Sequence, residues 1–107
     1  MANLPKPPDM FVEFTQRFPK LAEAWRLAQE AGGTGPLDEK TEKLVKLGVA
    51  IGHMREGAVH SAVRKALASG VNREEVEQVI ALAASTLGFS STVAVYSWVR
   101  DELGGGR

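Results

Sequence analysis

The hydrophobic residues of this chain recur at spacings of three and four, which is the period of an α-helix with one buried face. The clearest stripe lies between residues 76 and 87, directly before a glycine. Its members are Val76, Val79, Ile80, Ala83 and Leu87. No segment shows the sustained alternation of apolar and polar residues that a half-buried strand would show. The pattern therefore predicts an all-α fold.

Capping and helix-breaking residues predict where the first helices begin and end. Asp9 is expected to cap a short helix, and Pro19 is expected to separate that helix from the next one. The second helix should stop at Gly32-Gly33, and Asp38 should cap the third. Signals of this kind along the whole chain predict about six helices.

Similar signals follow in the second half of the chain. The third helix is expected to break at Gly52-His53, and a fourth is expected to run from about Arg55 to the residue before Gly70. Asn72 and Glu75 have the spacing of a capping box, which predicts the start of a fifth helix.

The last helix is expected to begin with Ser90 or Ser91 as its cap. It is apolar on more than one face, with more apolar surface than a small monomer could bury, so we expect an obligate homo-oligomer. We expect a single domain over residues 1–107, with a proline-rich extended arm at residues 1–8 and a frayed tail at residues 104–107.

Composition and charge exclude several classes of function. Thirteen basic residues balance thirteen acidic ones, which leaves no long-range field for nucleic acid or an anionic membrane. The chain has no cysteine, so thiol redox chemistry and thiolate metal sites are excluded. The N-terminal residues lack the apolar stretch of a signal peptide, and no run is long and apolar enough for a membrane span. We therefore expect a cytoplasmic protein without nucleic-acid or membrane partners.

The side chains best suited to chemistry are His53, Glu56 and His60. Their spacings of three and four place them on one face, if the helix is continuous. Imidazole and carboxylate groups transfer protons near neutral pH, which favours a catalytic acid/base role. The same groups could also bind a divalent metal ion, or they could be ordinary solvated or interface residues. Arg55 and Arg64 are candidate substrate-binding residues that would clamp a carboxylate, and the alternative is that they face solvent.

Residues 37–88 also resemble a known family. The opening Leu37-Asp38-Glu39-Lys40 and the turn over residues 69–76 are similar to those of the carboxymuconolactone decarboxylase family, which includes the alkylhydroperoxidase D-like proteins. The resemblance implies an alkylhydroperoxidase D-like helical bundle that assembles as a trimer or hexamer. The peroxidase members depend on a Cys-x-x-Cys motif, so their thiol peroxidase activity is not expected in this cysteine-free chain.

The family motif can be placed on this chain in two registers. Anchored on His60, the register puts His53 and Glu56 at the two cysteine positions, and Glu56-x-x-x-His60 matches the pattern that decarboxylase-type members keep. Anchored on Gly70, an ungapped register instead puts Arg55, Ala58 and Ala62 at the motif positions. The family's acidic partner, one helix earlier, would fall near Thr41 or Glu42, and Glu42 is otherwise a solvated residue.

The resemblance and the residues together give two alternatives for function. The first is a decarboxylase-like lyase that uses acid/base chemistry on a small organic acid or lactone, with no cofactor. The second is a non-catalytic oligomeric scaffold or small-molecule binding protein. Residues 73–100 superficially resemble a helix-turn-helix unit, but the last helix carries Val, Ala, Tyr and Trp where DNA-reading side chains would be needed.

Overall fold

The computed structural model describes residues 9–104 as an all-α chain, which confirms the predicted fold class. The contacts divide the chain into two compact units, whose described parts are residues 9–37 and residues 38–104. The extended arm predicted for residues 1–8 lies outside the described residues, as do residues 105–107 of the predicted tail.

The first unit contains α1, Asp9–Arg17, and α2, Pro19–Gly32. Pro19 occupies the start of α2, where its missing N–H and fixed φ cost nothing, so the predicted boundary is confirmed. The ring of Phe11 meets that of Trp25 edge to face at 4.8 Å between centroids. Neither helix contains a buried residue, although both carry large apolar side chains.

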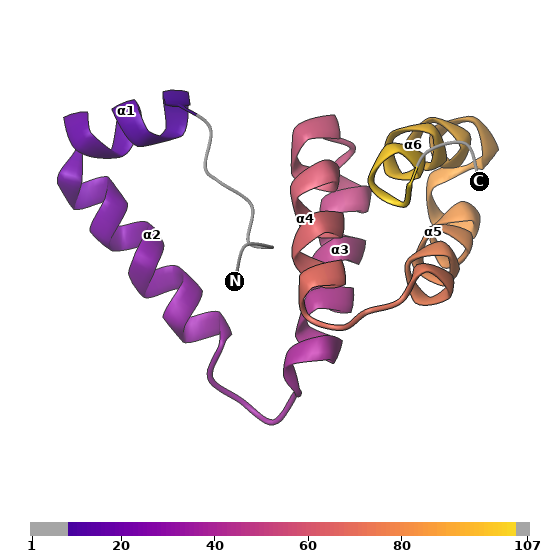
Figure 1. Ribbon diagram of the computed structural model, residues 1–107, viewed down its shortest axis with the longest axis horizontal. Helices are drawn as coiled ribbons and strands as arrows, with labels where there is room; N and C mark the ends of the chain where they lie inside the picture. The colour runs from indigo at the N-terminus through magenta and orange to yellow at the C-terminus, as the bar shows by residue number, and fades with distance from the viewer. Residues whose placement is uncertain (1–8, 105–107) are drawn as a thin grey trace. The chain divides into compact units, whose positions relative to one another are not determined.

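The second unit contains four helices: α3, Glu39–His53; α4, Glu56–Ala68; α5, Arg73–Leu87; and α6, Phe89–Glu102. Helix α3 packs against α4 and α5. Helix α6 also packs against both α4 and α5. Figure 1 shows α3 and α4 as a hairpin beside the pair formed by α5 and α6. Each helix thereby has two neighbours around a shared apolar core.

The core of this unit consists of small and medium aliphatic side chains. Its buried members are Leu47, Ile51, Val59, Val63, Ala66, Val71, Val76, Ile80, Val95, Val99 and Leu103. They come from all four helices and from the α4–α5 and C-terminal turns. Side chains at spacings of three and four supply this core, as the sequence pattern predicted.

Local capping accounts for two helix starts that the sequence predicted. The Asp38 carboxylate accepts a hydrogen bond from the Thr41 backbone N–H at 2.8 Å. At α5, Asn72 Oδ1 accepts from the Glu75 N–H, and Glu75 Oε1 accepts from the Asn72 N–H, so the capping box is complete.

Two predicted boundaries differ from the structure. The break after α3 lies at Met54, which adopts a left-handed conformation with φ 56°. Glycine at position 52 stays within the helix, so the predicted break at Gly52-His53 is displaced. Neither Ser90 nor Ser91 caps α6, because Gly88 takes a positive φ of 91° and Phe89 begins the helix directly.

Candidate functional site

His60 lies at the centre of a polar cluster between α4 and α6. Its Nδ1 is 2.6 Å from Glu102 Oε2, and its Nε2 is 3.2 Å from Glu56 Oε2. Arg64 Nη1 donates to the same Glu102 oxygen at 3.0 Å. These four residues, called the His60 cluster below, comprise two carboxylates, one imidazole and one guanidinium.

Apolar packing positions the members of the cluster. Val59 and Val63 point into the core from α4, which places His60 on the adjacent edge of the helix, toward α6. Val99 and Leu103 bury the facing side of α6, and Arg73 Nη1 donates to the Leu103 carbonyl at 2.8 Å. The end of α6 is therefore held in place, with Glu102 beside His60.

The members of the cluster differ in exposure. The side chains of His60 and Glu102 are each 19% exposed, whereas that of Glu56 is 58% exposed. Glu102 therefore holds Nδ1 from a sheltered position, and Nε2 faces the more open side of the cluster. An imidazole anchored through one nitrogen can exchange a proton through the other.

The hydrogen bond that the His60 ring donates to the Glu102 carboxylate raises the pKa of His60 above its ordinary value, and Glu56 adds to this effect. Partial burial of the ring acts in the opposite direction and is outweighed. The cluster thus favours the imidazolium form, with an N–H directed at each carboxylate. His60 is in this form a proton donor.

The raised pKa makes the stability of the fold depend on pH. Because the folded state binds the His60 proton more tightly than the unfolded chain, the pairing contributes fully below about pH 6.5 and is lost as the pH rises through the folded-state pKa. We expect Glu102→Gln to lower the free energy of unfolding by about 1–2 kcal/mol at pH 6 and by less at pH 9. Urea titrations at both pH values measure the difference. An equal loss at both would contradict the pairing of an imidazolium with Glu102.

His53 and Arg55 do not join the cluster. His53 is the last residue of α3, whereas Glu56 begins α4, so the three polar groups do not lie on one continuous helix, which was the condition for their sharing a face. The physical reason is the left-handed turn at Met54, which redirects the chain between them. Arg55 is the N-cap residue of α4 and is exposed. Within residues 9–104, no ion pair or hydrogen bond joins either side chain to the cluster.

Glu102 stands 42 residues after His60 and was not among the site residues predicted from the sequence. One signal was present in the sequence. A carboxylate in the last turn of a helix opposes the helix dipole, and such a residue is favourable only when a cation compensates for it. Glu102 ends α6, and His60 and Arg64 are the compensating groups.

A groove of about 580 Å³ lies between α3 and α5, away from the His60 cluster. Its walls are mainly apolar, with Val45 on α3 and Leu82 on α5 among them, and no member of the cluster lines it. Gly48 and Gly52 lie along it, and no atom beyond their own helix lies within 4 Å of where a Cβ would be. The two glycines thus leave this part of α3 open. Glu42, the candidate acidic partner from the family comparison, lies on α3 but does not line this groove.

Over residues 9–104, no three histidine or acidic side chains converge in a way that could hold a metal ion. None of the helices in this part of the chain is long and apolar enough to span a bilayer.

Comparison with known proteins places this fold in a family. The family model described as carboxymuconolactone decarboxylase matches residues 17–101, a range that includes Glu56, His60 and Arg64 and ends just before Glu102. No curated protein and no solved structure matches the chain. A match over this much of the sequence, together with the all-α architecture and the absence of cysteine, shows that the chain belongs to the carboxymuconolactone decarboxylase family and lacks the Cys-x-x-Cys motif of its peroxidase members.

Proposed function

We propose that the chain is a decarboxylase-type acid/base catalyst for a small organic acid or lactone, with His60 as the proton donor. The observation that carries this proposal is the 2.6 Å contact between His60 Nδ1 and Glu102 Oε2. This contact raises the pKa of a sheltered imidazole, which favours the protonated form, and it leaves Nε2 on the open side, beside the exposed Glu56. General acids in enzymes are often histidines tuned in this way.

The chemistry of decarboxylation needs such a donor. When a carboxylated unsaturated lactone loses carbon dioxide, the bond to the carboxylate carbon breaks and its electron pair remains on the ring as an enolate. The ring must then gain a proton, which the His60 imidazolium can supply from Nε2. Glu102 stays hydrogen-bonded to Nδ1 and orients the ring, so we assign it a positioning role.

The neighbouring groups have separate roles in this proposal. Glu56 lies 3.2 Å from Nε2 and must move aside for the substrate, which its exposure allows. Arg64 uses one N–H on Glu102, and its remaining donors can bind a substrate carboxylate. His53 and Arg55 have no step in it, because nothing in the described structure brings them to His60.

The test is release of carbon dioxide from carboxymuconolactone by the purified chain, followed together with the lactone absorbance between pH 6 and pH 9. We expect kcat to fall as the pH rises through the pKa of His60, because the protonated imidazole is the active form. No release at any pH in this range would contradict the proposal.

A non-catalytic scaffold or binding protein is the second candidate, and a specific observation favours it. The groove of about 580 Å³ between α3 and α5 contains no member of the His60 cluster in its walls. In this case the His60–Glu102 pair serves only to hold α6 against α4. Wild-type protein that binds a small organic acid without consuming it would favour this candidate.

We also propose that the chain assembles with itself, as a trimer or hexamer. Phe89, Val93 and Tyr96 on α6 are 82%, 52% and 40% exposed, and α1 and α2 contain no buried residue. Apolar surface of this extent is typical of subunit interfaces. Light scattering on a size-exclusion column should give three or six times the chain mass of 11.5 kDa. A monomer mass at micromolar concentration would contradict assembly.

A further inference from the structure

The groove between α3 and α5 is elongated, because every turn of two neighbouring helices contributes to its walls. Its lining residues begin at Thr41 on α3 and Glu75 on α5 and continue to Gly52 and Leu87. Lys40 Nζ pairs with Glu75 Oε2 at 2.9 Å between the first turns, and the groove reaches the last turns of both helices, so the helices run side by side in the same direction. At the rise of an α-helix, Thr41 and Gly52 lie about 16 Å apart. A volume of about 580 Å³ along this length is within the usual range of small-molecule sites.

Apolar side chains form both the floor and the rim of this groove. Leu44 and Val79 are partly buried against the core of the unit, so they form its floor. Val45 and Leu82 line it from the rim, and they are 51% and 66% exposed. Gly48 adds no side chain between them, and no atom beyond its own helix lies within 4 Å of where its Cβ would be. The middle of the groove is therefore open and apolar.

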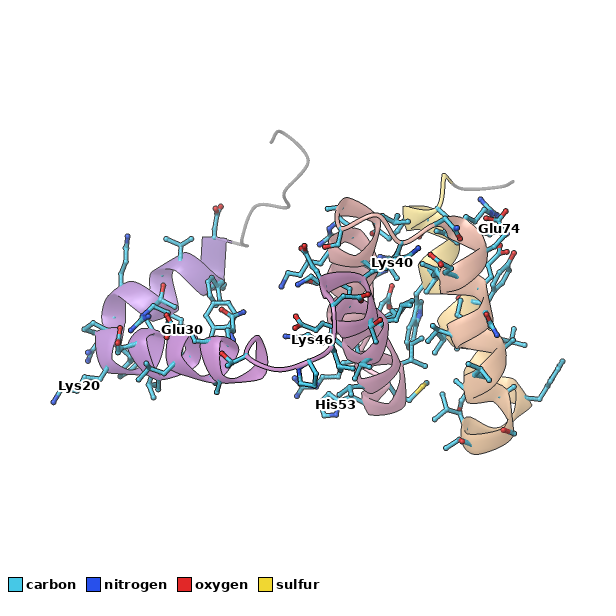
Figure 2. The ribbon with its side chains drawn as sticks, turned by 90° about the horizontal axis from the view of Figure 1, so that it is seen from below. Lys20, Glu30, Lys40, Lys46, His53 and Glu74 are labelled. Atoms are coloured by element: carbon cyan, nitrogen blue, oxygen red, sulfur yellow. The ribbon has the colours of Figure 1, made fainter. Side chains whose placement is uncertain are left out.

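The groove offers no uncompensated charge to a ligand. Glu75 is the one charged residue among the described residues that line it, and its two oxygens are occupied by the Asn72 N–H and by Lys40. Figure 2 shows Lys40 on the side of α3 toward α5 and Lys46 on the side away from it. Gln78, nearly one turn after Glu75, also lines the groove, and within residues 9–104 its side-chain amide has no hydrogen-bond partner. This amide can therefore bind a neutral polar group at the first end of the groove.

We propose that the groove binds a neutral amphiphile with one unbranched hydrocarbon chain, such as a long-chain alcohol. The chain lies along α3 and α5, and the head group lies at Gln78. Such a chain is apolar along its whole length, as the groove is, and an extended dodecanol molecule is about as long as the groove. A carboxylate head group would be repelled by Glu75 and is disfavoured. The site shares no residue with the His60 cluster, so the inference holds whether or not the chain is a decarboxylase.

The experiment is a titration of the full chain with hexanol, octanol and decanol below their solubility limits, followed by methyl NMR. We expect decanol to shift the methyl signals of Val45 and Leu82. Val93 on α6 is the internal control, because it is 52% exposed and lies outside this groove. Each added methylene group should tighten binding by up to roughly fourfold, since its burial contributes about 0.8 kcal/mol. Equal shifts at Val93, or an affinity that does not rise with chain length, would overturn the proposal.

Gly48→Leu tests the position of the hydrocarbon chain. The new side chain occupies the middle of the groove and should weaken decanol binding by roughly tenfold or more, because it displaces methylene groups that would lie there. Leucine favours a helix more than glycine does, so the fold should be kept, and circular dichroism checks this. Gly57→Leu makes the same change at an exposed glycine of α4 and should leave the affinity unchanged. Unchanged binding in Gly48→Leu would contradict the assigned site.

Two further measurements separate the head group and a competing occupant. Decanoate should bind more weakly than decanol, and equal affinity would overturn the preference for a neutral head group. Light scattering on wild type and Gly48→Leu reports whether a second copy of the chain fills the groove. A lower assembly mass in the variant, together with no alcohol-induced shift in wild type, would assign the groove to that second copy and overturn the proposal.

Discussion

Replacing His60 with alanine is expected to lower turnover of carboxymuconolactone by about 10²–10⁴-fold, the usual contribution of a general acid. The imidazole is the group of the cluster that can donate a proton near neutral pH, and its Nε2 is on the open side. Carbon dioxide release by the variant and by wild type at pH 7 measures the effect. Because the change also frees Glu102 from one partner, circular dichroism must show that both proteins are folded under the assay conditions.

His53→Ala is the matched control for this experiment, since it removes the same side chain from outside the His60 cluster. His53 is exposed at the end of α3, and we expect the variant to keep the wild-type rate. Equal losses in the two variants would contradict the assignment of the proton donor to His60. Full activity in His60→Ala would contradict it directly.

The largest expected effect on stability comes from Leu47→Ala. Leu47 is fully buried on α3, in the core that all four helices of residues 38–104 share. Removing its isobutyl group loses apolar burial and leaves a cavity, which typically costs about 2–5 kcal/mol. Chemical denaturation followed by circular dichroism gives the free energy of unfolding. A unit of this size has little stability in reserve, so partial unfolding at 37 °C is the expected outcome.

Leu82→Ala provides the matched comparison, because it makes the same chemical change at a side chain that is 66% exposed on α5. We expect a loss of roughly 0.5 kcal/mol or less for a substitution at the surface. A loss as large as that of Leu47→Ala would contradict the observed position of the core.

The helix boundaries that the sequence predicted correctly depend on local interactions. Asp38 and the Asn72–Glu75 pair cap their helices with groups three residues away, so a short stretch of sequence contains the complete interaction. The displaced break between α3 and α4 shows the opposite case. Met54 takes a conformation that glycine accepts more readily, and no local pattern pointed to a methionine in this role.

The candidate site likewise has a part that local sequence determined and a part that it did not. Glu56 and His60 are four residues apart within α4, so helical geometry alone determined that they would meet, and the sequence predicted this pair. His53 would share that face only on a continuous helix, and the left-handed residue Met54 separates α3 from α4 instead. The family match and the absence of cysteine also followed from the sequence itself.

Only the tertiary structure decided which carboxylate controls His60. Glu102 reaches the imidazole because Val95 and Val99 are buried with Val59 and Val63, and this packing sets the end of α6 against α4. Helical periodicity predicts which face of each helix is apolar, but it does not specify which helix will cover that face. The pairing across 42 residues, and with it the raised pKa of His60, therefore depends on how the helices pack.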